Sequence, residues 1–325
     1  MSEVELRRLV GVSLNAAIDK TAAVERLVPG AIHRPRILSV VPGGKAVNAI
    51  RAGRQLGLAG EVVAVLGGHA GRWYREALAA RGIALHAVEV EDETRTCLSV
   101  LDESTGSLTE FYEAGVRLAA ADWPRVEAGL RNALDTDPGG ALTVLAGSLP
   151  PGAPVDAYGR LAAIAAARGA RAVVDIDGEA LAAALAARPW LVKVNAAEAA
   201  SVTGVAAGDR DAAVRAGRAL VAMGATNAIV TRGIEGAVAV TADGAWSVGG
   251  VPPEARGPFS VGSGDAFLAG LAVAIARGEA LPDAMRTGVA AGSANARMPG
   301  QGELDPAEVE RVRATVEVAR LDQVP

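Results

Sequence analysis

The chain has 325 residues, half of them hydrophobic and only 3% aromatic, with 32 lysines and arginines against 37 aspartates and glutamates. This mildly acidic balance, without a basic block, argues against general binding to nucleic acids or membrane surfaces. Cys97 is the only cysteine and no two of the three histidines show metal-ligand spacing, so neither an intrachain disulfide nor a thiolate-rich metal site is expected. With no signal peptide or membrane span visible, we expect a soluble protein of the cytoplasm.

Short apolar runs bounded by Gly, Asn or Asp recur along the chain and predict buried parallel strands. These runs cover residues 9–14, 62–66, 142–146, 172–176, 191–194 and 228–230. Alanine-rich segments with helical spacing lie among the later runs, at residues 157–167, 179–187 and 210–223. Such an alternation of strands and helices predicts a doubly wound α/β sheet.

Two regions interrupt the alternation, residues 21–41 and 87–112, which are rich in β-forming residues without helical spacing. The second contains a turn-like segment at residues 102–106 between two strand candidates. Together they predict a small separate sheet, which would serve either as a lid over a cleft or only as an edge hairpin. A further hairpin is expected over residues 236–248. Since no linker or repeat divides the chain, we expect one domain with a lid.

Two loops near the start of the chain carry polar groups. Asp19 lies just past the 9–14 strand, where open α/β sheets bind ligands, and would either bind sugar hydroxyls or be a solvated loop residue. The glycine pair 43–44 precedes a predicted helix and lets a ligand approach the backbone closely. Lys45 adds a positive charge, and Asn48 adds a donor and an acceptor. The alternative for this second loop is an ordinary turn with a solvated lysine.

Three later strands are each followed by turn-forming or polar residues. Ser148 lies in the 147–152 turn, which its prolines and glycines explain without a function. Asn195 and Glu198 would meet Mg²⁺ waters and phosphates, or form a capping box at a helix start. The glycines of the 231–236 segment would allow backbone contact with nucleotide phosphates, or only a tight turn.

The segment Gly262-Ser263-Gly264-Asp265 is the strongest candidate for chemistry. Its glycines lead into a predicted helix, whose free N–H groups and dipole favour phosphate oxygens. Asp265 would accept a proton from a hydroxyl that attacks a phosphoryl group, or only support the helix start. The segment is neither a Walker A loop nor a dinucleotide fingerprint. Because several candidate segments follow strands at the same edge of one sheet, we predict a single ligand site there.

These motifs, in this order and spacing, resemble the ribokinase-like (PfkB) carbohydrate kinases, in particular the branch with 1-phosphofructokinase and tagatose-6-phosphate kinase. The resemblance is carried by residues 13–19, 30–34, 43–48, 94–96, 147–152, 175–181, 193–198, 261–270 and 290–300. It implies a ribokinase-like three-layer α/β/α fold with a central, mostly parallel sheet. It also implies a single domain over residues 1–325, with a small β-sheet lid at about 20–41 and 87–113.

The resemblance implies ATP-dependent phosphorylation of a hydroxyl of a ketohexose phosphate: fructose 1-phosphate, tagatose 6-phosphate or fructose 6-phosphate. Asp265 would be the general base, and Gly262 and Gly264 would present amides to the transferring phosphate. The groups expected around the sugar phosphate are Asp19, Arg34, Gly44, Lys45, Asn48, Arg95 and Ser148. Those expected around ATP and Mg²⁺ are Asn195, Glu198, Thr231, Gly233, Gly236, Ser263 and Asn295, with Glu198 meeting Mg²⁺ through water. The family resemblance further implies a homodimer formed through the lid sheets.

Some positions depart from the usual motifs of this family. Ala46 and Ala266 replace a glycine and a serine, and Asp177 adds a carboxylate near the cleft. These departures leave the substrate open, so a kinase of an unphosphorylated sugar or a nucleoside is an alternative. A sugar-phosphate sensor without catalysis is a third possibility, against which the intact Asp265 and its glycines argue. We interpret Cys97 as a packing residue rather than a nucleophile.

Overall fold

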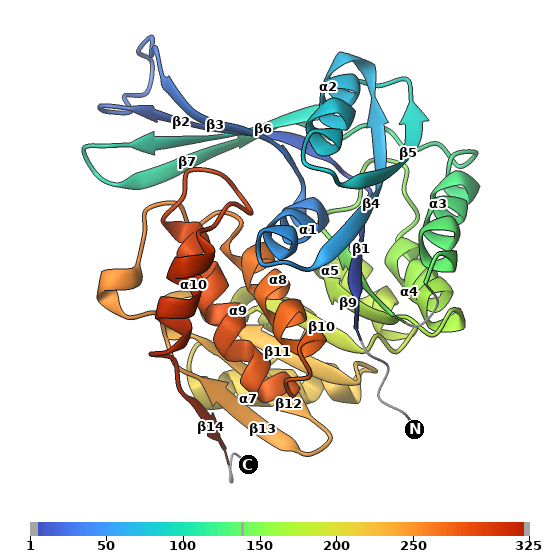
Figure 1. Cartoon of the computed structure of the whole chain (residues 1–325), viewed down its shortest axis with the longest axis vertical. Coiled ribbons are helices and arrows are strands. Elements are labelled where there is room, and N and C mark those ends of the chain that lie inside the picture. Colours follow the sequence, from blue (N-terminus) through green and yellow to red (C-terminus); the bar gives the residue numbers. More distant parts are fainter. Residues whose placement is uncertain (1–5, 138–139, 322–325) are drawn as a thin grey trace.

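The computed structural model describes residues 6–137 and 140–321, whose strands form two separate sheets (Figure 1). The strands of the main sheet are β1 (Arg8–Ser13), β4 (Ala59–Gly67), β5 (Ala84–Val90), β8 (Ala141–Ala146), β9 (Arg171–Asp175), β10 (Leu191–Asn195), β11 (Asn227–Thr231), β12 (Ala237–Thr241), β13 (Gly244–Val248) and β14 (Val318–Arg320). Their order across the sheet is β14-β13-β12-β11-β10-β9-β8-β1-β4-β5.

The strands from β11 to β5 run parallel, whereas β12, β13 and β14 pair antiparallel at one edge. Successive side chains of a strand point to opposite faces, so Val62 and Ala64 of β4 enter one apolar cluster and Val63 and Val65 enter another. Burial on both faces explains why these strands are continuous apolar runs. The chain leaves β1 toward β4 and returns to its other side at β8. Ligands of open α/β sheets bind at such a reversal of strand order.

Helices cover both faces of the main sheet, which gives three layers. The helices that pack on one apolar cluster are α1 (Lys45–Gln55), α2 (Gly68–Ala79), α8 (Ser263–Ala276), α9 (Leu281–Ala296) and α10 (Pro306–Arg313). Those on the other are α3 (Trp123–Asp135), α4 (Ala157–Ala167), α5 (Gly178–Leu185), α6 (Ala196–Thr203) and α7 (Arg210–Ala222). The described residues also include the short 3₁₀ turns η1 (Gly233–Glu235) and η2 (Pro253–Ala255). Within the described ranges, no helix has the length and apolar character needed to cross a membrane.

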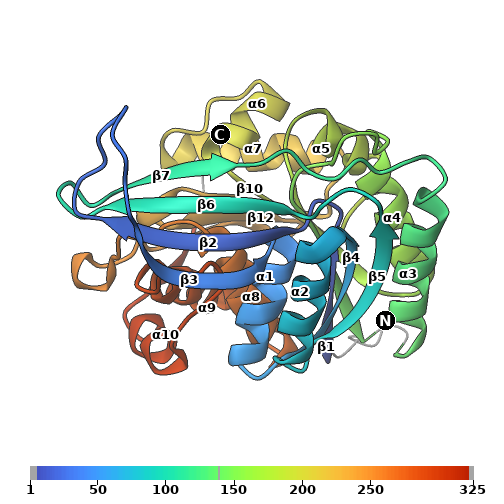
Figure 2. The ribbon, with the colours of Figure 1, turned by 90° about the horizontal axis from the view of Figure 1, so that it is seen from above.

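The small sheet projects beyond the body of the molecule, and its four strands lie side by side in the view from above (Figures 1 and 2). Its strands are β2 (Ala17–Val24), β3 (Arg36–Gly43), β6 (Arg95–Asp102) and β7 (Ser107–Tyr112), in the order β3-β2-β6-β7. Strands β2 and β6, which come from distant parts of the chain, pair in parallel at its centre. Two separate segments of the chain therefore form the small sheet, as predicted.

One boundary of the predicted lid is wrong, because residues 87–90 belong to β5 at the edge of the main sheet. An edge strand is only partly covered, and Val88 is the one fully buried residue of β5, so this strand resembles a half-exposed lid strand. The hairpin expected over residues 236–248 is confirmed as the antiparallel pair β12–β13. The doubly wound α/β sheet predicted from the alternating pattern is also confirmed, as is the three-layer architecture that the resemblance implies.

Candidate active site

A pocket of about 680 Å³ opens at the carboxyl ends of the parallel strands, between the main sheet and the small sheet. It is lined by loops that follow β1, β8, β9, β10 and β11, by side chains of β2, β6 and β7, and by the first turns of α1 and α8. The point where the strand order reverses, between β1 and β8, contributes Asn15 and Ser148 to its wall. Topology thus gathers side chains from most of the chain into one cleft.

The first turn of α8 forms a wall suited to an anion. Gly262 precedes the helix with a φ of 82°, a left-handed conformation that a side chain would strain. A Cβ on Gly264 would lie 3.3 Å from the Lys193 Nζ atom. Because both positions lack side chains, the backbone N–H groups of this helix start stay accessible from the pocket, where the helix dipole adds positive potential.

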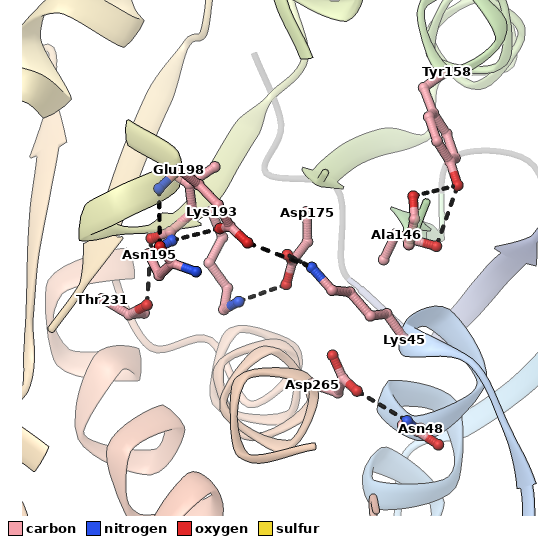
Figure 3. A network of polar contacts seen from close by, with 12 residues as sticks. Lys45, Asn48, Ala146, Tyr158, Asp175, Lys193, Asn195, Glu198, Thr231 and Asp265 are labelled. Atoms are coloured by element: carbon pink, nitrogen blue, oxygen red, sulfur yellow. Dashed lines mark hydrogen bonds and ion pairs between the residues drawn. The ribbon is translucent and has the colours of Figure 1, made fainter. Parts of the chain in front are cut away.

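Asp265 lies in this first turn and is only 6% exposed. Its carboxylate does not cap the helix; instead it accepts a hydrogen bond of 3.0 Å from the Asn48 amide (Figure 3). Burial, together with the carboxylate of Asp175, raises the pKa of Asp265 to about 7, while Asn48 and the lysines nearby oppose the rise. A carboxylate with a pKa near neutrality is suited to accept a proton in catalysis.

A second buried carboxylate, Asp19 on β2, lies on the other side of the same amide, at 3.5 Å from Asn48 Nδ2. Burial raises the pKa of Asp19 to about 6, and the positive charge of Arg51 is the strongest opposing influence. A Cβ at Gly43 would lie 1.9 Å from its Oδ2 atom, so the missing side chain at Gly43 makes room for this carboxylate. Asn48 therefore bridges the small sheet to the start of α8.

A third carboxylate, Asp175 at the end of β9, is held by two ammonium groups that approach from different sides (Figure 3). Lys193 Nζ lies 2.5 Å from one oxygen and Lys45 Nζ lies 3.2 Å from the other. Burial alone would raise the pKa of Asp175, but the two lysines outweigh it and lower the pKa below its usual value. Asp175 in turn raises the pKa of Lys45. Lys45, which is 3.8 Å from Glu198, is thus a fixed cation in the pocket wall.

The opposite end of the pocket carries the polar groups that follow β10 and β11. Asn195 and Glu198 form a complete capping box at the start of α6, which is the structural alternative that the sequence left open. Thr231 donates to the Val194 carbonyl, 3.3 Å away. Gly233 begins the η1 turn and Gly236 follows it. Both have positive φ angles, and both line the pocket.

The end of the pocket near β1 and β8 carries groups suited to a substrate phosphate. Ser148 Oγ accepts a hydrogen bond of 2.9 Å from the Asn15 amide, and Arg95 donates to the Asn15 carbonyl at 3.1 Å. The buried Tyr158 hydroxyl donates to the Gly147 carbonyl at 2.8 Å and so fixes the turn that carries Ser148. These contacts hold the Ser148 hydroxyl and the Arg95 guanidinium in the pocket wall, which also carries the Lys45 ammonium.

The structure brings every site residue expected from the sequence to this pocket except Arg34 and Asn295. Arg34 lies on the exposed loop between β2 and β3, outside the pocket lining. Asn295, expected in the nucleotide cleft, is fully buried behind it, where its amide donates to the carbonyls of Gly300 and Glu303. Its place inside the long α9 helix, on a buried face, explains the difference.

Two residues at the centre of the pocket, Asp175 and Lys193, were not singled out as site residues from the sequence. Lys193 stands inside an otherwise apolar strand and is only 4% exposed. A charged side chain within a buried parallel strand is rarely tolerated without a partner, so the sequence did hold a signal for it. Its partner Asp175 ends another such strand, but their contact depends on the pairing of β9 with β10.

Comparison with known proteins agrees with this site. The family model described as pfkB family carbohydrate kinase matches residues 10–308. The 1-phosphofructokinase of Xanthomonas campestris is 38% identical over 274 residues, which cover 82% of this chain and 83% of that protein. The ATP-dependent 6-phosphofructokinase isozyme 2 of Escherichia coli is 30% identical over 289 residues, with 88% and 92% covered.

A solved structure shows the same fold. Phosphofructokinase-2 from Escherichia coli in complex with fructose-6-phosphate superposes with a TM-score of 0.83 at 27% sequence identity. The match covers 95% of this chain and 99% of that one, so it includes both the main sheet and the small sheet. The resemblance inferred from the motifs is confirmed: this chain belongs to the pfkB family of carbohydrate kinases.

Proposed function

We propose that this protein transfers the γ-phosphoryl group of ATP to a hydroxyl of a ketohexose phosphate. The observation that carries the proposal is the buried Asp265 in the first turn of α8, where the helix start is suited to bind an anion. Its pKa is raised to about 7, so it can accept a proton in the same pocket wall. The related 1-phosphofructokinase and the neighbour with bound fructose-6-phosphate support a sugar phosphate as the acceptor.

On the acceptor side, we infer that Asp19, Gly44 and Asn48 bind sugar hydroxyls. Lys45, Arg95 and Ser148 would bind the phosphate already on the sugar, because guanidinium and ammonium groups make strong charge-assisted hydrogen bonds to phosphate. A neutral sugar would not need this positive charge. On the donor side, ATP would lie against Thr231, Gly233, Gly236 and Ser263, with Asn195 near its phosphates.

In the proposed reaction, the ionised Asp265 takes the proton of the acceptor hydroxyl while the oxygen attacks the γ-phosphorus. The bond from that phosphorus to the β–γ bridging oxygen breaks, and ADP leaves. The N–H groups at Gly262 and Gly264 stabilise the negative charge on the transferring group. The Lys193 ammonium beside Gly264 adds positive charge at the same place.

Magnesium is proposed as a partner of the nucleotide rather than as a resident ion. Among the described residues, no group of three or more His, Cys, Asp or Glu side chains is arranged to hold a metal. Glu198 is the carboxylate at the donor end that fits a contact through water, in keeping with the few protein ligands that Mg²⁺ uses beside phosphates. When bound, the ion would neutralise charge on the ATP phosphates.

We also propose that the small sheet acts as a lid and that two chains associate through it. Its apolar side chains Ile37, Val40 and Phe111 are exposed, which a second copy would cover. Arg34, on the loop of that sheet, would then approach a sugar phosphate only through lid movement or from a neighbouring chain. The cytoplasmic location stays a prediction.

A substrate panel with coupled detection of ADP tests the proposed function. Fructose 1-phosphate, tagatose 6-phosphate, fructose 6-phosphate, fructose and adenosine are compared at equal ATP. The highest kcat/KM is expected for one of the three sugar phosphates. A higher value for fructose or adenosine would show that the acceptor is not a sugar phosphate. Binding of ATP and a sugar phosphate without any release of ADP would indicate a sensor instead.

A further inference from the structure

Arg51 of α1 is a buried arginine that the proposed mechanism does not use. Its side chain is 1% exposed and does not line the pocket. Nη1 donates to the Pro42 carbonyl at 3.3 Å and to the Gln301 carbonyl at 2.8 Å, while Nη2 pairs with Glu303. Burying a guanidinium is costly. For stability alone, a well-packed apolar side chain would often serve as well at this position. What these contacts hold together is therefore of interest.

The first segment that Arg51 holds is the turn at residues 42–44, against which the Asp19 carboxylate lies. The Tyr74 hydroxyl donates to the Gly43 carbonyl at 2.7 Å, next to the carbonyl that Arg51 binds. The Asp19 carboxylate occupies the space that a side chain at Gly43 would need. Two donors behind the turn thus fix the backbone on which this pocket carboxylate rests.

The second segment is the loop at residues 300–303, which packs on the anion-binding turn of α8. A Cβ at Gly262 would lie 2.9 Å from the Gln301 Cα atom, so the loop and the turn are in close contact. The Gln301 amide also donates to Ser99 of the small sheet at 3.4 Å. By binding the Gln301 carbonyl, Arg51 joins the sugar side of the pocket, the phosphate side and the small sheet.

Arg51 also acts on Asp19 through its charge. Burial raises the pKa of Asp19 to about 6, and of the groups that hold it down, Arg51 has the largest effect. The other polar and titratable groups that face Asp19 from the elements around it are Asn48, the Gly44 N–H, Arg95, Tyr74, Cys97 and Tyr112. The two positive charges that act on Asp19 are thus Arg51 and Arg95. Arg95 lies in the pocket wall, where a substrate phosphate would engage it, whereas Arg51 does not line the pocket.

We propose that Arg51 is a positioning residue: its guanidinium fixes the 42–44 turn and the 300–303 loop in one arrangement, and its positive charge keeps the Asp19 carboxylate ionised for the sugar. The second half rests on the proposed function, because it assumes that Asp19 binds a sugar hydroxyl. The first half concerns this chain alone. The effect of Arg51 on Asp19 is separated from the proposed function by measuring the pKa of Asp19 in the protein without substrate.

The pKa of Asp19 in the ligand-free protein is followed by NMR of ¹³C-labelled aspartate carboxyls, with Asp19→Asn to assign the signal. The double variant Arg51→Met/Glu303→Gln removes the cation without leaving an unpaired carboxylate. It is expected to raise the midpoint from about 6 by about one unit or more. Arg51→Lys, which keeps the charge, is expected to stay close to the parent protein. An unchanged midpoint in the double variant would overturn the proposal.

Glu303→Gln alone keeps the test decisive should the double variant fail to fold. It frees the guanidinium from its carboxylate, so the Asp19 midpoint is expected to stay or fall. A rise would contradict the proposed influence of Arg51. Circular dichroism and thermal unfolding of each variant establish that the fold is intact.

Kinetics with fructose 1-phosphate and ATP test the consequence for substrate binding. At pH 6 the double variant is expected to raise the KM for the sugar phosphate by about fivefold, since a rise of one unit from a pKa of about 6 lowers the ionised fraction of Asp19 from about one half to about one tenth. At pH 8 the difference in this KM between the double variant and the parent protein is expected to be smaller. The KM for ATP is expected to change little at either pH. Equal rises in both constants at both pH values would mean general loosening and overturn the positioning role. The expected Asp19 shift in a protein without kinase activity would instead refute the proposed function alone.

Discussion

Asp19 and Asp265 flank the amide of Asn48, and each has a raised pKa because it is buried. A neighbouring charge acts on the pKa of each carboxylate, but in opposite directions. The carboxylate of Asp175 raises the pKa of Asp265 further, whereas the cation of Arg51 restrains that of Asp19. At neutral pH, Asp19 is therefore mostly ionised while Asp265 is poised to exchange a proton. This difference suits one group for binding hydroxyls and the other for general-base catalysis.

The raised pKa of Asp265 predicts a pH-dependent effect on stability. Folding favours the protonated form, so its contribution is full below pH 4, where the unfolded group titrates, and is lost as the pH rises through about 7. Asp265→Asn cannot ionise, and is expected to raise the free energy of unfolding at pH 8 by about 2–4 kcal/mol relative to the parent protein. At pH 5 the gain should be smaller. Thermal melts at both values check this; equal gains would contradict the buried, high-pKa carboxylate.

Arg95 gives a prediction on substrate binding. If it contacts the phosphate already on the sugar, Arg95→Ala removes a charge-assisted hydrogen bond worth about 1.5–3 kcal/mol, which corresponds to about a 10- to 100-fold rise in the KM for the sugar phosphate. The KM for ATP is expected to change much less. Arg117→Ala, at an exposed position outside the pocket lining, is the control. An unchanged KM for the sugar phosphate would show that Arg95 lies away from the phosphate.

At the scale of elements, two helix starts form the reacting part of the pocket. Helix α1 begins at Lys45 after Gly44, whose φ is 102°, and α8 begins at Ser263 after Gly262, whose φ is 82°. Each start places a glycine where backbone must approach a ligand, and each brings a catalytic or binding side chain one turn later. The two helices also pack against each other through Gly53 and Ala269. Asn48 and Asp265 meet because of this packing.

Gly264→Ala tests the anion-binding start of α8. Alanine has a higher helix propensity than glycine by about 1 kcal/mol, so stability is expected to be unchanged or higher. The new methyl group would lie 3.3 Å from Lys193 Nζ and narrow the space of the transferring phosphate, so we expect kcat to fall by at least about tenfold. Gly208→Ala, where a Cβ meets nothing within 4 Å, is the matched control. A normal kcat in Gly264→Ala would place the phosphate elsewhere.

The sequence predicts the elements well where their pattern is strong. Buried parallel strands are unmistakable as apolar runs, and glycine-rich helix starts reveal their chemistry through composition. The 87–90 boundary failed because a partly covered edge strand, like a lid strand, is rich in β-forming residues and lacks helical spacing. The Asp175–Lys193 pair and the Arg51 contacts escaped because both join residues through tertiary packing, 18 and 250 residues apart in the chain. Periodicity carries no information on such contacts.

At the scale of the molecule, the pocket lies between two sheets of different character. The main sheet is covered on both faces, and it supplies a rigid edge from which the loops project. The small sheet has only partial cover and contributes Asp19, Arg95 and Tyr112 to the same pocket. A movement of the small sheet would therefore open or close the acceptor side without disturbing the core.

The exposed apolar side chains of the small sheet predict self-association. Sedimentation or light scattering is expected to give a dimer or a larger assembly of the 32.7 kDa chain. The double variant Ile37→Lys/Phe111→Lys replaces two side chains that are each 54% exposed and is expected to shift the protein toward monomer. Val155→Lys, also exposed but far from the small sheet in the sequence, should have no effect. A parent protein that remains monomeric would contradict association through the lid.

The most direct test of a sugar-phosphate kinase with Asp265 as its base is the turnover of Asp265→Asn. ADP release is measured at saturating ATP and fructose 1-phosphate, beside the parent protein and the control Asp156→Asn, an exposed aspartate that makes no capping bond. We predict a kcat lower by about 10²–10⁴-fold in Asp265→Asn, with ATP affinity retained and the control unchanged. A kcat within tenfold of the parent protein would contradict the assignment of Asp265 as the base.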